Sequence, residues 1–317
     1  MGIVRTVLGD ISPADMGVTY SHEHIIIEDS YPTATNPDFL LNDVEKIAAE
    51  LSAVYAAGGR TMVDTMPVNC GRNVTKLAAV SRRSGIHILA PTGLHLEMYY
   101  PPAHWRFDYS EDDLAALFIA DIEEGIDAFD YNGPLVRRTA YRAGLIKLAT
   151  GDEAINNHQR MVFGAVAKAY HATGAPILTH TNAGLHAMAQ AELFQRLGVD
   201  LAHVVISHVD RYKDVGYHRE LLQSGVQVEY DSAFRWKASD TNWTYLLLEQ
   251  LLPEFPNQIT VGMDAARNSY WHAYGGQPGL TYLVTTFRHE LDKRGLGSYW
   301  HKVMIENPAS LYTFSPR

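Results

Sequence analysis

The 317-residue sequence is poor in cysteine and has no long apolar run. Its one cysteine, Cys70, cannot form a disulfide within the chain, which favours a reducing compartment. No stretch approaches the roughly 18 consecutive apolar residues of a membrane span. The first residues also lack the sustained apolar core of a secretory signal peptide. These absences predict a cytoplasmic protein with no membrane partner.

Positive charge is scarce as well. The chain has 26 Lys and Arg against 36 Asp and Glu, a formal net charge of −10, which argues against nucleic acid or an anionic membrane as a partner. The glycine-rich patterns GxGxxG and GxxxxGKS are missing, which excludes dinucleotide-binding and P-loop readings. A small-molecule substrate is the partner that we expect.

What the chain does contain is a regular alternation of short apolar runs and segments of helical period. The apolar runs predict buried parallel strands at residues 17–27, 60–66, 86–93, 144–150, 175–181, 203–209, 226–231 and 259–265. Helices, several with a capping Ser, Asp or Asn and a terminal Gly, are expected at residues 43–58, 73–85, 110–126, 156–174, 185–198, 215–225, 244–255 and 281–295. An open doubly wound sheet seldom reaches eight such units, so we predict an α/β protein with a single (β/α)8 barrel domain over residues 1–317 and a short N-terminal β extension.

Metal-binding residue types fall at equivalent points of these strands. His22 and His24 are two residues apart on the first strand and therefore share a face. Other candidates lie late in the strands that follow, namely Lys147, His180, His208 and Asp264. Taken alone, His180 or His208 could be a core histidine, and Asp264 could be a helix cap. Because the carboxyl ends of all barrel strands converge on one mouth, we expect the six side chains to surround a single point.

Imidazole and carboxylate donors suit Zn²⁺, with Mn²⁺, Fe²⁺ or Co²⁺ as alternatives. Four histidines and one aspartate exceed the ligands of a single catalytic zinc, and they fit two cations about 3.5–4 Å apart. An ammonium group at Lys147 would repel both cations. A neutral amine could instead take up carbon dioxide and bridge them as an anionic carbamate.

Several segments together resemble the phosphotriesterase family of the amidohydrolase superfamily. In chain order, from about Thr6 to Leu311, they are TVLGDI, SHEHI, CGRNV, IKLAT, LTHTNA, ISHVD, GMDAAR and ENPASLY. The resemblance implies a distorted (β/α)8 barrel with two divalent metals and suggests a homodimer. It also implies the ligand roles: the more buried metal on His22, His24 and Asp264, the outer metal on His180 and His208, and carboxylated Lys147 as the bridge, together with a hydroxide.

This arrangement predicts hydrolysis by a hydroxide that bridges the metals. Two cations lower the pKa of a shared water toward 7, and the outer one polarises the carbonyl or phosphoryl oxygen of the substrate. Asp264 is then expected to accept the proton and to deliver it to the leaving alkoxide. No serine or cysteine nucleophile is required.

The loops after the seventh and eighth strands indicate the substrate. They carry Arg235, Lys237, Arg267 and Tyr270, in the region where such barrels usually bind phosphate. Lys237 with the spacing Arg267-x-x-Tyr270 is similar to the phospho-furanose lactonase branch of the family, so a phosphorylated sugar 1,4-lactone is the expected substrate. Whether Arg235 contributes is left open. The alternative is that these cations pair with acidic neighbours such as Asp231, Asp240 or Glu229.

Other functions compete with this interpretation. The same ligand set would serve a lactonase for unphosphorylated or acyl-homoserine lactones, or an organophosphate triesterase. A Schiff-base aldolase would use Lys147 as a free amine but would leave the clustered histidines without a role. A catalytically inactive binding protein is disfavoured because all ligand positions are intact. His95 stands where some lactonases of the family carry a tyrosine, so its part in the chemistry is open.

Overall fold

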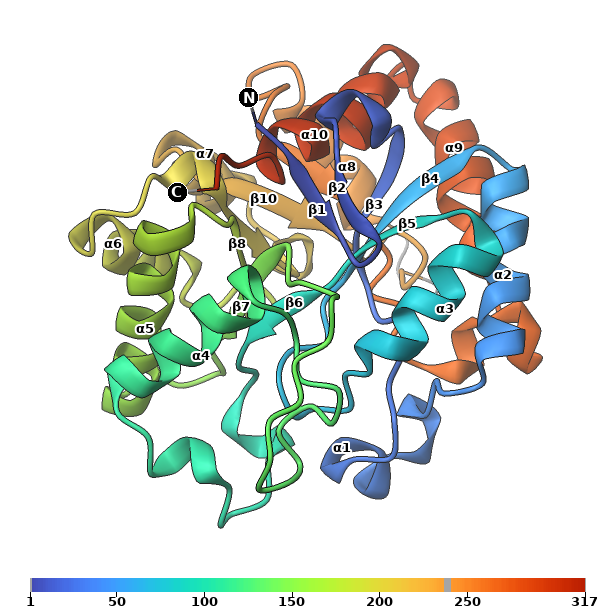
Figure 1. The fold of residues 1–317 in the computed structure, drawn as a ribbon. Coiled ribbons are helices and arrows are strands. Elements are labelled where there is room, and N and C mark those ends of the chain that lie inside the picture. The colour runs from blue at the N-terminus through green and yellow to red at the C-terminus, as the bar shows by residue number, and fades with distance from the viewer. Residues whose placement is uncertain (1, 237–240, 317) are drawn as a thin grey trace.

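The computed structural model describes residues 2–236 and 241–316 and has a barrel of parallel strands surrounded by helices (Figure 1). The barrel strands are β3 (Val18–Glu23), β4 (Gly59–Asp64), β5 (His87–Leu89), β6 (Pro91–Gly93), β7 (Leu145–Ala149), β8 (Ile177–His180), β9 (Val204–Ser207), β10 (Gln227–Tyr230) and β11 (Ile259–Val261). β5 and β6 are separated only by Ala90, so they occupy the place of the single strand predicted at 86–93. The described residues therefore contain the eight predicted strand positions in order.

The strands pair in parallel as two hydrogen-bonded sets, β3-β4-β5 and β6-β7-β8-β9-β10-β11. Backbone N–H groups of Met263 and Asp264 donate to the His22 carbonyl at 3.3 and 2.9 Å, which joins the end of β11 to β3. Gly262 permits this approach, because a Cβ there would lie 2.7 Å from the backbone nitrogen of His22. The prediction of a (β/α)8 barrel is confirmed.

Helices cover the outside of the barrel (Figure 1). They are α1 (Tyr31–Thr35), α2 (Val44–Ala56), α3 (Val74–Ser84), α4 (Glu111–Glu123), α5 (Asn157–Thr173), α6 (Ala187–Arg196), α7 (Val215–Gln223), α8 (Trp243–Leu251), α9 (Arg288–Lys293) and α10 (Asn307–Leu311). Local signals set the boundaries: the side chain of Asn156 caps α5, and Gly174 ends it with φ 77°. None of the helices among the described residues combines the length and the apolar character needed to cross a membrane.

The last predicted helix, at 281–295, is less regular than expected. A 3-10 helix (Leu280–Tyr282) leads into a π-helix (Leu283–Phe287), and only Arg288–Lys293 is α-helical. The hydroxyl of Thr285 donates to the Thr281 carbonyl at 2.8 Å. Such side-chain competition with the backbone, together with consecutive β-branched residues, disfavours a regular α-helix here.

The barrel interior is filled from the end opposite to the candidate site. A separate buried apolar cluster comprises Val4, Met16, Val63, Leu89, Leu145, Leu178, Val205, Leu311 and Tyr312. Leu145 and Leu178 precede Lys147 and His180 by two residues, so they share their face at a deeper level. The antiparallel extension β1 (Val4–Thr6) and β2 (Gly9–Ile11) closes this end. The two chain ends lie near it (Figure 1). The other mouth of the barrel is left for the site.

Candidate active site

The four predicted histidines converge at the carboxyl ends of the strands. The ring centroids of His22 and His24 are 5.7 Å apart, and those of His22 and His208 are 4.7 Å apart. His180 lies 4.6 Å from His208 by the same measure. Strands β3, β8 and β9 thus bring together side chains that are up to 186 residues apart in the chain.

Asp264 faces this cluster with both carboxylate oxygens, and Oδ2 lies 3.9 Å from Nδ1 of His208. Its Oδ1 lies 3.3 Å from Nε2 of His24 and 3.8 Å from Nε2 of His22. Burial alone would raise the pKa of Asp264, but the neighbouring His208 and Arg235 outweigh it and hold this pKa well below its usual range. Glu23, which lies between the two histidines in sequence, accepts hydrogen bonds from the backbone N–H groups of Met263 and Ala265 and so positions the Asp264 turn.

Two of these residues have strained backbones. His208 has φ 65° and Asp264 has φ 49°, in the left-handed region that non-glycine residues rarely adopt. Each such conformation costs on the order of 1 kcal/mol or more. The strain aims both side chains into the mouth of the barrel, just beyond the ends of β9 and β11.

A further layer of polar groups sets the orientation of the histidines. Nδ1 of His208 pairs with Asp231, and Nδ1 of His22 lies 3.0 Å from Glu229 and 3.1 Å from Ser207 Oγ. Because these contacts involve only Nδ1, they leave Nε2 of both His22 and His208 available. Sequence reasoning missed the orienting role of Glu229, in β10, and of Asp231, directly after it, although a spacing of two residues in a predicted strand indicates a shared face.

These donors fit divalent metal ions. Nε2 of His22 is buried without a hydrogen-bond partner, and His22, His24 and Asp264 place their ligand atoms within 4.8 Å of one another. A second group with the same property comprises His22, His208, Glu229 and Asp231. His180 pairs its Nε2 with Asn182 Oδ1 at 2.8 Å, which leaves Nδ1 available. Imidazole, carboxylate and a buried nitrogen without a partner form a suitable donor set.

Lys147 is buried in β7, with 1% of its surface exposed, and is close enough to His22 and His180 to act on their charges. No hydrogen bond or ion pair joins its amine to any described residue. Burial lowers the pKa of Lys147 to about 7, although the carboxylates of Asp264 and Glu229 act in the opposite direction. A substantial fraction of this amine is therefore neutral near pH 7, as uptake of carbon dioxide requires.

A cavity of about 210 Å³ opens over the cluster. Its lining includes His24, His95, His180, His208, Arg211, Arg235, Asp264, Arg267 and Tyr270. The structure therefore brings three of the four predicted phosphate-binding residues to the same cavity as the metal candidates. The fourth, Lys237, lies outside the described residues.

These cations also have partners within the chain. Arg235 donates to Asp264 Oδ2 at 3.1 Å and to Tyr270 Oη at 3.1 Å. Arg267 lies 3.5 Å from Asp38 and over the ring of Phe39. Arg235 and Arg267 therefore do pair with acidic neighbours, but with Asp264 and Asp38 rather than with Asp231 or Glu229. Asp240, the third acidic residue named from the sequence, lies outside the described residues.

Arg211 is a cation that the sequence interpretation overlooked. It ends the short helix after β9, three residues beyond His208, and lines the cavity. Its Nη2 lies 2.9 Å from Asp264 Oδ2 and 2.7 Å from Asp231 Oδ1. A basic residue three positions after a candidate ligand was the signal that could have identified it.

Comparisons with known proteins agree with this geometry. The profile described as the Phosphotriesterase family matches residues 2–312. A phospho-furanose lactonase of Mycoplasmopsis agalactiae is 30% identical, with 98% of this chain and 91% of that protein covered. The crystal structure of an amidohydrolase from Mycoplasma synoviae superposes with a TM-score of 0.95 at 29% identity, covering 99% of this chain and 92% of that one. A phosphotriesterase homology protein from Escherichia coli, solved with phosphate in its active site, has a TM-score of 0.85 at 28% identity and covers 94% and 99%.

Proposed function

The chain belongs to the phosphotriesterase family and is a hydrolase of ester bonds, and we propose that its substrate is a phosphorylated furanose 1,4-lactone. One observation carries this proposal: Arg235, Arg267 and Tyr270 line the same cavity as the histidines and Asp264. A substrate with an ester bond at one end and a phosphate at the other matches this division. The lactonase relative and the phosphate in the Escherichia coli structure support it.

We propose that six residues hold two divalent cations. Zn²⁺ is the preferred candidate, and Mn²⁺, Fe²⁺ or Co²⁺ are alternatives. The six residues are His22, His24, Lys147, His180, His208 and Asp264. When bound, such cations supply hydroxide at neutral pH and polarise the lactone carbonyl. Lys147 would bind them as a carbamate, formed when its neutral amine adds to the carbon of carbon dioxide and releases a proton.

The remaining steps fall to the chain's own side chains. The carboxylate of Asp264 accepts a proton from the attacking water as the new bond to the lactone carbonyl carbon forms. When the bond between that carbon and the ring oxygen breaks, Asp264 returns the proton to the ring oxygen. The product is a hydroxy acid, and the phosphate is unchanged.

The phosphate would lie on the side of the cavity formed by the loop after β11. Arg267 offers a planar fork that can bind phosphate with two hydrogen bonds, and the Tyr270 hydroxyl adds a donor. The contact of Arg267 with Asp38 is long, at 3.5 Å, and the Arg267 side chain is 40% exposed. A phosphate can therefore reach the guanidinium without displacing a tight ion pair.

The direct test is a panel of 1,4-lactones of pentonic and hexonic acids, each with and without phosphate. We expect kcat/KM to be about 10²-fold higher or more for the phosphorylated lactones, because a lactone without phosphate would leave the polar groups of the phosphate side unpaired. Acyl-homoserine lactones and a paraoxon-like triester serve as controls. Equal activity on the dephospho-lactones would overturn the proposed substrate.

Variants of the phosphate side sharpen this test. Lys237→Ala, Arg267→Met and Tyr270→Phe should raise KM for phosphorylated lactones only. Lys213→Ala is the matched control, because Lys213 contacts Trp236 outside the cavity. For the aldolase alternative, borohydride with a ketone substrate would trap a covalent adduct on Lys147, and such an adduct would discredit Lys147 as a metal ligand.

We also propose that the enzyme works in the cytoplasm as a homodimer. The location follows from the single cysteine, and the dimer rests on the family resemblance. Light scattering of the purified protein measures the mass directly, and a value near the 35.3 kDa of one chain would contradict the dimer.

A further inference from the structure

His95 is a fifth histidine at the cavity. It lies two residues beyond β6, lines the cavity beside His180 and His208, and has its ring centroid 5.0 Å from that of His180. The ligand set proposed above does not use it. The question is therefore which of its two nitrogens is available, and in which form.

The hydrogen bonds of the chain answer this question. The backbone N–H of Leu96 donates to Nδ1 of His95 at 2.7 Å. That nitrogen therefore carries a lone pair, and in the neutral ring the proton lies on Nε2. No hydrogen bond to Nε2 of His95 is found from any residue in the ranges 2–236 and 241–316. A donor N–H is thus left for a molecule in the cavity.

The two neighbouring rings have the opposite arrangement. His208 directs Nδ1 to the carboxylate of Asp231, and His180 directs Nε2 to the carbonyl oxygen of the Asn182 side chain. Each of these oxygens accepts a hydrogen bond from the protonated nitrogen of the ring. The other nitrogen therefore keeps its lone pair for a metal. His95 has its lone pair engaged by the backbone instead, which makes it a hydrogen-bond donor rather than a metal ligand.

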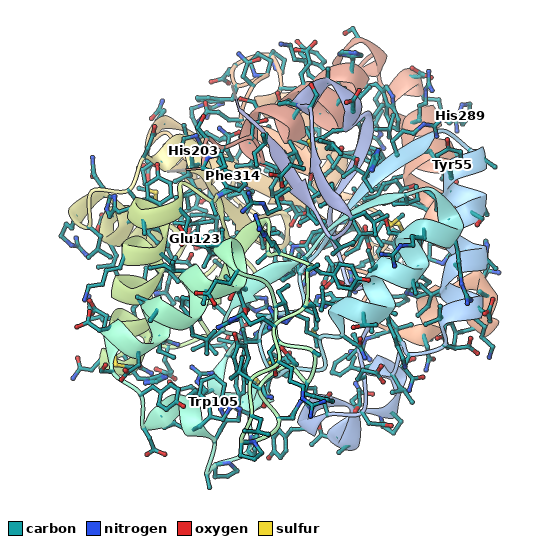
Figure 2. All side chains as sticks on the ribbon, in the orientation of Figure 1. Tyr55, Trp105, Glu123, His203, His289 and Phe314 are labelled. Carbon is teal, nitrogen blue, oxygen red and sulfur yellow. The ribbon has the colours of Figure 1, made fainter. Side chains whose placement is uncertain are left out.

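The backbone of His95 is fixed from both sides. Its N–H donates to Tyr100 Oη at 2.9 Å, and the Tyr100 hydroxyl donates to the Val68 carbonyl at 3.0 Å. Its carbonyl accepts from Arg106 Nη1 at 2.9 Å. This arginine belongs to the segment marked by the labelled Trp105 at the lower edge of the molecule (Figure 2).

Arg106 is an unusual anchor. It is 2% exposed, its Nε has no partner, and its Nη2 pairs with the ring of His158 at 3.0 Å. Among the described residues no carboxylate forms an ion pair with it. Burying a guanidinium without an acidic partner is costly. The guanidinium lies over the rings of Tyr100 and Phe107, 4.4 and 5.1 Å from their centroids, which offsets part of this cost. A buried and immobilised Arg106 thus fixes the His95 carbonyl.

We propose that His95 is a catalytic residue whose Nε2–H donates a hydrogen bond to the carbonyl oxygen of the substrate. As water attacks the carbonyl carbon, the π electron pair moves onto that oxygen, and the hydrogen bond strengthens with the developing negative charge. The proton stays on Nε2 throughout. The donor is positioned before the reaction, so no reorganisation is needed. This inference rests on the proposed lactone hydrolysis.

The test compares His95→Leu, which removes the donor, with His95→Gln, whose side-chain amide can place an N–H near the position of Nε2. We expect His95→Leu to lower kcat about 10²-fold with little change in KM, and His95→Gln to retain most of the wild-type kcat. His289→Leu is the control, because His289 lies on the outer surface of α9 (Figure 2). The metal content of each variant is measured by elemental analysis and should equal that of the wild type.

The outcome separates this inference from the proposed substrate. The loss in His95→Leu should be the same factor on phosphorylated and dephospho-lactones, because His95 acts at the ester and not at the phosphate. If the wild type prefers another lactone or carboxylic ester of the panel, the proposed substrate fails and the variants are compared on that compound. A near-normal kcat in His95→Leu, an equal loss in both variants, a loss of metal from His95→Leu, or no acyl substrate at all would overturn the role of His95.

Discussion

Arg211 holds Asp264 on the oxygen that does not face His22 and His24: Nη2 of Arg211 lies 2.9 Å from Oδ2 of Asp264. The same nitrogen lies 2.7 Å from Asp231, and Nε donates to Ser232 Oγ at 2.8 Å. One guanidinium from the loop after β9 thus braces residues that follow β10 and β11. Asp264 and, through Asp231, His208 are kept in place by this brace.

Replacing Arg211 with methionine should therefore destabilise the protein. Asp231 is fully buried. Without the Arg211 guanidinium, the negative charge of its carboxylate is less well compensated. We expect the free energy of unfolding to fall by roughly 2 kcal/mol. This is less than the loss for a fully buried pair, because 29% of the Arg211 side chain is exposed. Urea denaturation measures the change. Arg219→Met, which breaks the surface pair with Glu254, should change stability little, and an equal loss in both variants would contradict the brace.

Asp264→Asn should lower kcat about 10²-fold or more, because the amide can neither accept nor return the proton. The pKa of Asp264 lies well below its usual range, since His208 and Arg235 outweigh the effect of burial. The wild-type carboxylate is therefore ionised at all pH values above that depressed pKa. Steady-state kinetics from pH 5 to 9 check both statements, and a near-normal rate in the variant would assign the base elsewhere.

Removal of the metals should abolish activity and lower the thermal stability. Ligand binding to the folded state alone raises its stability by mass action, so the melting temperature should rise when Zn²⁺ is added back to chelated protein. Elemental analysis of protein purified without chelators should find about two divalent ions per chain. A preparation that is active and contains no metal would refute the proposed centre.

His218 should make stability dependent on pH away from the active site. Burial lowers the pKa of His218 to about 4. Its Nδ1 accepts from the Tyr230 hydroxyl and its Nε2 donates to the Tyr212 carbonyl, both at 2.9 Å. In the unfolded chain the same histidine has a pKa near 6.5. The contribution of neutral His218 to folding stability is therefore complete above pH 6.5. It is lost as the pH falls toward 4, because the unfolded chain binds the proton first. The loss amounts to roughly 3 kcal/mol.

The measurement for His218 is the melting temperature between pH 7 and 4.5. His218→Gln should flatten this dependence relative to the wild type, since glutamine does not titrate. His289→Gln, on the surface of α9, should leave it as it is. If all three proteins lose stability in parallel, other groups control the acid response.

Much of the fold and of the candidate site could be predicted because the signals are local. The side chain of Asn156 and the conformation of Gly174 bound α5 within one residue of the predicted 156–174. The spacing of two residues predicts a shared face for His22 and His24, and their ring centroids lie 5.7 Å apart, at the end of β3 and directly after it. Where local chemistry competes, as in the threonine-rich segment at 281–287, the predicted regular helix was wrong in detail.

The orienting residues could not be predicted with equal success. Glu229 meets His22 across 207 positions of sequence, and Arg211 meets Asp264 across 53. Asp38 reaches Arg267 from the loop after β3. None of these pairs has a local signature, because only barrel closure brings their strands and loops to one mouth.

The sequence alone determined the order of strands and helices and the types of candidate metal-binding side chain. It could do so because periodicity, capping and residue chemistry act over a few neighbouring positions. Which nitrogen of each histidine is free, which oxygen of Asp264 is already engaged, and which cations share the cavity were decided by the tertiary structure. Hydrogen bonds and ion pairs depend on distances of a few ångströms between residues that the chain separates by tens to hundreds of positions.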